Sequence, residues 1–161
     1  MKCINCGKDG MAPGVEDFPY PTSGLPDVVL VGVRVERCPH CGEYEVEIPE
    51  VKALHRALAH DVVKRESPLT PQEIRFLRKH LDWTGVEMAT TFGVTKETVS
   101  RWENGRERMS PTADRLLRAA VLLLEPVEGW SIERFRAIGT EAAPRPPLRF
   151  TRSAGGWQEA A

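Results

Sequence analysis

Two copies of the pattern C-x-x-C-G constrain the fold more than any other feature of this 161-residue chain. The first is CINCG at residues 3–7, the second is CPHCG at residues 38–42, and together they hold all four cysteines. The C-x-x-C spacing lets two sulfurs converge on one cation, and the glycine that follows supplies the left-handed backbone that the turn needs. We therefore expect one tetrahedral metal site of four sulfurs, formed by Cys3, Cys6, Cys38 and Cys41.

Zinc in a structural role is the metal that we expect, because four protein ligands leave no position open for water. Iron is the main alternative, since paired C-x-x-C-G knuckles also occur in rubredoxins and the geometry suits either metal. A disulfide pair is disfavoured because the start of the chain, MKCINCGKDG, lacks an apolar secretory segment, which predicts a cytoplasmic protein with reduced thiols. A redox-active dithiol is also disfavoured, because neither motif opens a helix after a strand.

The residues around the knuckles favour a small sheet followed by a helix. Residues 28–38 are rich in β-branched side chains, and residues 43–48, EYEVEI, alternate apolar and acidic side chains. The proline-rich stretch 11–27 predicts a loop or an irregular hairpin arm. A helical apolar period starts at Pro49 and ends near residue 64. We expect residues 1–66 to form a zinc-binding module with a connecting helix.

The next part of the chain has the signals of a compact helical domain. The patterns TPQE at 70–73 and TGVE at 84–87 have the spacing of an N-cap and its reciprocal acid, so each predicts a helix that starts just after its threonine. Thr95 can cap a third helix and Ser110 a fourth, and residues 131–138 form a short amphipathic segment.

Residues 84–105, TGVEMATTFGVTKETVSRWENG, carry two apolar stripes on either side of Gly93. This pattern predicts two short helices that meet at a tight glycine turn, the frame of a helix-turn-helix, whose second helix lies in the major groove of DNA. Val99 and Trp102 are expected to face the core, which leaves the polar residues of that helix outward. The alternative is a helical bundle whose arginines only solvate its surface.

Each exposed side chain of this segment has a plausible partner on DNA. Arg101 can pair with guanine through two hydrogen bonds, Lys96 can reach guanine or phosphate, and Glu97 can accept from cytosine. Threonines at helix N-termini favour phosphate, and arginines beyond the turn can bind the DNA backbone. A local cluster of cations can therefore bind DNA although the net charge of the chain is −1. The expected DNA-binding residues are Thr84, Thr95, Lys96, Glu97, Thr98, Ser100, Arg101, Arg106 and Arg108.

The stretch 70–105 resembles the Xre family of lambda-repressor-like domains, notably in VSRWENG. Together with CINCG and CPHCG, the order of parts over roughly residues 1–125 resembles the MqsA antitoxin family, also described as YgiT-type zinc-finger proteins. The resemblance implies that the N-terminal zinc domain holds a toxin ribonuclease, with the four cysteines as ligands. It also implies a C-terminal domain that dimerises and binds an operator palindrome to repress its own operon, with Arg101 as a base reader. The family pattern has asparagine where Glu97 stands.

These observations predict an α+β chain with a zinc-binding β-rich module at 1–66, an all-α lambda-repressor-like helix-turn-helix domain at 67–140 and a disordered tail at 141–161. The tail is rich in Pro, Gly and Ala and has no apolar period. We expect a repressor that binds double-stranded DNA as a homodimer through its C-terminal domain, and a toxin partner at the N-terminal module.

Two other functions remain open from the residues. One is a stand-alone zinc-containing transcription regulator, and the other is a rubredoxin-like electron-transfer protein. We expect no enzyme, because none of the histidines stands in a pattern that marks a nucleophile or an open metal site. We also expect no membrane insertion, because the longest apolar runs, VVLVGV and AAVLLL, are far shorter than a bilayer requires.

Overall fold

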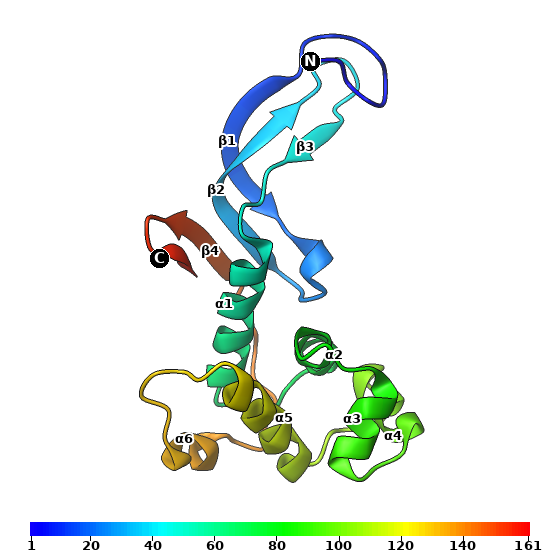
Figure 1. Ribbon diagram of the computed structural model, residues 1–161, viewed down its shortest axis with the longest axis vertical. Helices are drawn as coiled ribbons and strands as arrows, with labels where there is room; N and C mark the ends of the chain where they lie inside the picture. The colour runs from blue at the N-terminus through cyan, green and yellow to red at the C-terminus, as the bar shows by residue number, and fades with distance from the viewer. The chain divides into compact units, whose positions relative to one another are not determined.

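The computed structural model describes residues 1–161, which form two compact units (Figure 1). One unit, the sheet unit, comprises residues 1–21, 27–54 and 147–161. The other, the helical unit, comprises residues 22–26 and 55–146. The division falls inside the connecting helix rather than at residue 66, and the last fifteen residues belong with the N-terminal cysteines. The chain as a whole is α+β, as the sequence predicts.

The sheet unit is built around its longest strand, β2 (Val28–Arg37). The strand β1 (Ala12–Pro19) pairs with β2 antiparallel along most of its length, so residues 12–19, expected as a loop or hairpin arm, are a regular strand with one bulge. On its other side β2 pairs antiparallel with the three-residue β3 (Tyr44–Val46) and parallel with β4 (Leu148–Ser153). A fifth strand, β5 (Gly156–Glu159), pairs antiparallel with β4.

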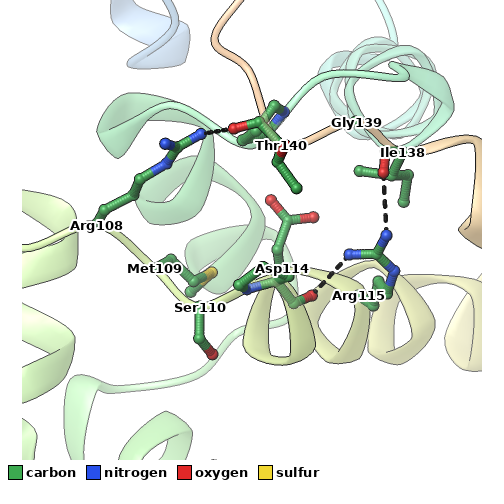
Figure 2. A pocket seen from close by; sticks show the side chains of 10 residues that line it. Arg108, Met109, Ser110, Asp114, Arg115, Ile138, Gly139 and Thr140 are labelled. Atoms are coloured by element: carbon green, nitrogen blue, oxygen red, sulfur yellow. Dashed lines mark hydrogen bonds between the residues drawn. The ribbon is translucent and has the colours of Figure 1, made fainter.

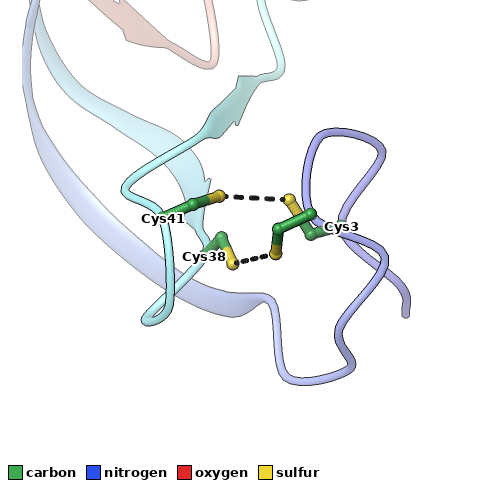
Figure 3. Close-up of side chains that lie close together, drawn as sticks. Cys3, Cys38 and Cys41 are labelled. Atoms are coloured by element: carbon green, nitrogen blue, oxygen red, sulfur yellow. Dashed lines mark hydrogen bonds between the residues drawn. The ribbon is translucent and has the colours of Figure 1, made fainter.

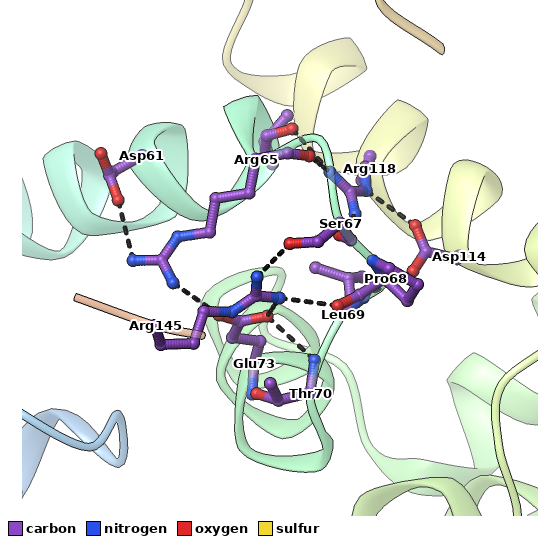
Figure 4. Close-up of polar contacts among 11 residues, drawn as sticks. Asp61, Arg65, Ser67, Pro68, Leu69, Thr70, Glu73, Asp114, Arg118 and Arg145 are labelled. Carbon is purple, nitrogen blue, oxygen red and sulfur yellow. Dashed lines mark hydrogen bonds and ion pairs between the residues drawn. The ribbon is translucent and has the colours of Figure 1, made fainter. Parts of the chain in front are cut away.

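The C-terminal residues form part of this sheet, which corrects the expectation of disorder over 141–161. Leu148 lies opposite Val28 and Phe150 opposite Leu30, and the side chains of all four are buried. Trp157 in β5 is only 8% exposed. The segment before the hairpin is fixed as well, because Arg145 pairs with Glu73 at 2.9 Å inside the helical unit (Figure 4). Pairing partners about 120 residues away make these strands, so local composition could not indicate them.

The helical unit has the helix starts that the capping patterns predict. The helix α1 (Val51–Lys64) enters the unit at His55, and α2 (Pro71–His80) and α3 (Gly85–Phe92) each begin with a complete capping box. Thr95 caps α4 (Lys96–Glu103) and Ser110 caps α5 (Pro111–Leu124). A short α6 (Ile132–Ala137) follows. None of these helices has the length and apolar character that a membrane span requires.

The core of the helical unit comes from one face of each of the five longer helices. These faces meet because each helix buries the apolar residues that recur at three- and four-residue spacing. The fully buried members include Leu58, Val62, Ile74, Leu77, Met88, Val99, Leu117 and Val121. This packing fixes the orientation of α3 and α4, and therefore decides which of their side chains face solvent.

Candidate metal centre and nucleic-acid interface

The two cysteine motifs form matching turns. In the first, the Gly7 amide donates to the Cys3 carbonyl at 2.8 Å, and in the second the Gly42 amide donates to the Cys38 carbonyl at 3.0 Å. Gly7 and Gly42 have φ angles of 70° and 77°. Only glycine adopts this left-handed backbone without cost, so each glycine allows the chain to leave the turn while both sulfurs of the motif point the same way.

The four sulfurs converge on one point, as Figure 3 shows. All four Sγ atoms lie within 4.8 Å of one another, and two cross-motif pairs, Cys3 with Cys41 and Cys6 with Cys38, are each separated by 3.6 Å. A disulfide requires about 2.05 Å between sulfurs. A tetrahedron with metal–sulfur bonds of about 2.3 Å has edges of about 3.8 Å, close to the two measured separations.

The surroundings shift the pKa values of two of the thiols, Cys38 and Cys6, in opposite directions. Backbone amides of His40 and Cys41, with His40 the stronger influence, lower the pKa of Cys38 to about 6. The amide of Lys8 acts to lower the pKa of Cys6, but partial burial and the three neighbouring sulfurs raise it to about 11. Asn5 Nδ2 donates to Cys41 Sγ at 3.7 Å. Amide donors therefore stabilise the thiolate form of Cys38, and a bound divalent cation would stabilise the thiolate forms of the other three cysteines.

The donor set fits a metal ion and leaves it no open coordination site. Cys3 and Cys38 are buried, whereas His40 is exposed and is not needed to complete the four ligands. A closed site of four thiolates holds its metal for folding rather than for chemistry on a substrate. The predicted ligand set is thus brought together, in a geometry that fits one metal ion without specifying which metal.

The helix-turn-helix has the geometry that the sequence predicts. Gly93 follows α3 with a φ of 68°, and Thr95 begins α4 by accepting a hydrogen bond from the Thr98 amide. Val99 and Trp102 are 1% and 4% exposed, so they hold α4 against the core. The opposite face of α4 is left in solvent.

Six of the predicted DNA-binding residues line one shallow hollow of about 520 Å³ on this exposed face, between the start of α3 and α4. Thr84 and Lys96 begin the two helices, and Arg101 lies 3.6 Å from the Glu107 carboxylate. Thr95 and Thr98 are not part of its lining, and their hydroxyls lie 3.0 Å from each other. The lining residues are Thr84, Gly85, Val86, Lys96, Glu97, Ser100, Arg101 and Arg106.

Arg108 is not brought to this hollow. Its guanidinium donates to the carbonyl of Thr140, and it lines a separate cavity of about 250 Å³ beside the start of α5 (Figure 2). In this position Arg108 joins the helix-turn-helix to the segment after α6. No local pattern indicates this contact, because its partner is a backbone atom 32 residues further along the chain.

Sequence reasoning also missed the ion pairs that anchor α4. Glu103 at the end of α4 has only 8% of its side chain exposed and accepts two hydrogen bonds from Arg78 of α2. Arg78 also donates to the Trp83 carbonyl at 2.8 Å. Because the partners are 25 residues apart, no spacing rule within a helix points to the pair. The contact fixes the direction of α4.

Comparison with known proteins identifies the family of this chain. Residues 1–124 match the family described as the MqsA antitoxin component of a bacterial toxin-antitoxin system. The chain belongs to the MqsA antitoxin family. It is 31% identical over 119 residues to antitoxin MqsA of Escherichia coli strain K12, a match that covers 73% of this chain and 90% of that protein. The part that matches the MqsA family includes all four cysteines and the helix-turn-helix, whereas α6, β4 and β5 lie beyond it.

Proposed function

We propose that this MqsA-family antitoxin is a DNA-binding repressor that regulates its own operon. The observation that carries the proposal is the exposed face of α4, where Lys96, Ser100 and Arg101 line one hollow while Val99 and Trp102 fasten the helix from behind. A helix presented in this way fits the major groove, where an arginine can read guanine through two hydrogen bonds. The chain's net charge of −1 is no obstacle, because binding depends on the local arrangement of cations.

The test is a gel-shift titration of operator and non-operator DNA with Arg101→Ala. Losing a base-reading arginine should cost about 1–3 kcal/mol of discrimination at one base pair and relax specificity there. Arg136→Ala is the matched control, because Arg136 is an exposed arginine of α6 outside the hollow. Unchanged discrimination by Arg101→Ala would remove this residue from base reading.

Pairing of two copies through the helical unit would provide the two recognition helices that a palindromic operator requires. Leu123 and Leu124 are 83% and 66% exposed at the end of α5, and Leu116 is 42% exposed on the same helix. Large exposed apolar residues on one helix are typical of a protein interface. A homodimer with its helices one DNA turn apart would span roughly 34 Å. Leu123→Glu with Leu124→Glu should give monomers in sedimentation analysis.

We assign zinc to the four-cysteine centre and a toxin partner to the sheet unit. The closed set of four sulfurs supports a structural zinc ion, and iron is distinguished by the red colour that a ferric site of four sulfurs gives to the native protein.

The family description as an antitoxin component supports the toxin partner. Protein purified from its native host should carry the toxin with it. Chelation should release the toxin before it abolishes operator binding, because the metal lies in the sheet unit. Purification without any partner would instead favour a stand-alone regulator.

A further inference from the structure

A second polar cavity lies in the helical unit, away from the face of α3 and α4. Its volume is about 210 Å³, and it is bounded by α2, by His55 of α1 and by the short 3-10 turn η1 (Pro21–Ser23) with Gly24. None of its lining residues belongs to the proposed DNA-binding set. The function proposed above therefore leaves this cavity without a role.

The lining of this cavity is rich in donors and has no carboxylate. Lys79, Gln72 and Thr22 each present a side chain that has no hydrogen bond or ion pair in the structure. Arg75 also lines the cavity, although it forms an ion pair with Glu103 at 3.5 Å and donates a hydrogen bond to Asn104 at 3.1 Å. A lysine, an amide and a hydroxyl without partners, and with no acid among them, form a set that suits the oxygens of an anion.

The base of the cavity is aromatic, and its central ring is buried. Phe76 is 5% exposed, its ring is stacked with His80 at 6.2 Å, and His55 meets it edge-on at 6.1 Å. His80 is tied by a 2.8 Å contact to Glu125, which lies outside the lining. Burial, with a smaller effect of His80, lowers the pKa of His55. Against such a base a charged hydrogen bond is stronger than in open water.

We propose that this cavity binds a phosphate group, held by Lys79, Gln72 and Thr22 with Arg75 at its margin. A volume of about 210 Å³ is that of roughly seven liquid water molecules, enough for a phosphate with a small organic part. The same chemistry is offered by a free phosphorylated small molecule and by the DNA backbone. Thr22, Gln72 and Lys79 are exposed at the mouth of the cavity, and its lining shares no residue with the hollow of α3 and α4, which favours the free molecule.

Occupancy of this site would join η1 to α2. Arg75, at the margin, also contacts Glu103 and Asn104 at the end of the recognition helix. A bound phosphate that attracts the Arg75 guanidinium would therefore weaken the contacts of Arg75 with the end of α4. The ligand could change operator affinity in this way. The site itself requires no part of the DNA-binding proposal.

The test is isothermal calorimetry of the full-length, metal-loaded protein with inorganic phosphate, at ionic strength held constant with chloride. We expect saturable binding of one phosphate per chain, weakened about 10-fold by Lys79→Ala, because a charged hydrogen bond contributes about 1.5 kcal/mol. Gln72→Ala should weaken it by a smaller factor. Lys64→Ala is the matched control, since Lys64 is an exposed lysine on α1 outside the cavity, and it should bind phosphate like the unaltered chain.

Two results would overturn the proposal. Absence of saturable phosphate binding by the folded protein would overturn it directly, and so would equal binding by Lys79→Ala and Lys64→Ala. A gel-shift series over salt concentration separates the two sources of phosphate. If Lys79→Ala lowers the affinity for all DNA sequences and reduces the salt slope by about one, while free phosphate does not bind, the phosphate is that of DNA and the small-molecule site is excluded.

Discussion

The indole nitrogen of Trp157 donates a 2.9 Å hydrogen bond to the backbone carbonyl of Pro49, joining β5 to the segment just before α1. Both residues belong to the sheet unit, and Arg152 strengthens the same junction through a 2.8 Å ion pair with Glu50. The C-terminal hairpin therefore fastens the start of the connecting helix. The hairpin lies outside residues 1–124, the segment that matches the MqsA family.

Trp157→Ala should destabilise the sheet unit. Trp157 is 8% exposed, so the change removes a buried aromatic side chain together with its hydrogen bond, and tryptophan-to-alanine changes of this kind cost about 3–5 kcal/mol. Denaturant unfolding followed by circular dichroism measures the loss. Gln158→Ala, at the exposed neighbouring position, should change stability by less than about 0.5 kcal/mol. Equal stability of the two variants would mean that the hairpin contributes nothing to the fold.

Arg118 should be the most sensitive charged residue of the helical unit. Its side chain is fully buried, pairs with Asp114 at 2.7 Å and donates to the carbonyls of Val63 and Ser67 (Figure 4). Arg118→Met leaves the Asp114 carboxylate buried without its cation, which costs about 3–5 kcal/mol. Thermal unfolding provides the measurement. Arg136→Met, which removes an exposed arginine, serves as the comparison, and a similar melting temperature for both would contradict the assignment.

Removal of the metal should unfold the sheet unit before the helical unit. The cysteines hold together two turns that lie at the N-terminus and after β2, and a small sheet depends on such a link for its stability. Addition of a strong chelator should therefore collapse the chemical-shift dispersion of the strand amide signals of residues 1–50 in an NMR spectrum, while the signals of α2 to α5 keep their positions. Strand signals indifferent to the chelator would show that the four sulfurs do not hold a structural ion.

Gly93→Ala should destabilise the helix-turn-helix through its backbone alone. A Cβ at this position meets no atom within 4 Å, but the φ of 68° costs a residue with a Cβ about 1–2 kcal/mol. Gly85→Ala is a paired comparison, because Gly85 is also free of steric contact and lacks a positive φ. That change should be neutral or stabilise by about 0.4–1 kcal/mol. Gly93→Ala should thus lower the melting temperature, whereas Gly85→Ala should raise it or leave it unchanged.

The capping box of α3 should make the free energy of unfolding vary with pH in the acidic range. A hydrogen bond from the Thr84 backbone amide, reinforced by the Thr84 side chain, lowers the pKa of Glu87 from 4.5. Because the folded value lies below the unfolded one, the stabilisation is complete above the unfolded pKa and is lost as pH falls through the folded pKa. Glu87→Gln should therefore melt below the unaltered chain at neutral pH, and the gap should close in acid. Glu128→Gln, an exposed change outside any capping box, should show no such closing gap.

Local sequence determined the cysteine cluster, the helix starts and the turn of the helix-turn-helix. The C-x-x-C-G spacing predicted which sulfurs meet, and the threonine–glutamate pairs at 70–73 and 84–87 predicted where α2 and α3 begin. Gly93 predicted the turn between α3 and α4. Each of these features depends on backbone conformation and hydrogen bonds within a few residues, so the residues that decide it are adjacent in the chain.

Tertiary structure alone decided the rest. The strand β4 exists because β2 offers it an edge about 120 residues away, and β5 in turn pairs with β4. Arg108 points to Thr140 because α6 returns the chain to that place. The cavity bordered by Lys79 likewise combines residues from three separate segments. Such contacts are gained only when distant parts of the chain pack together, and the free energy that selects them comes from burial and pairing that no short stretch of sequence contains.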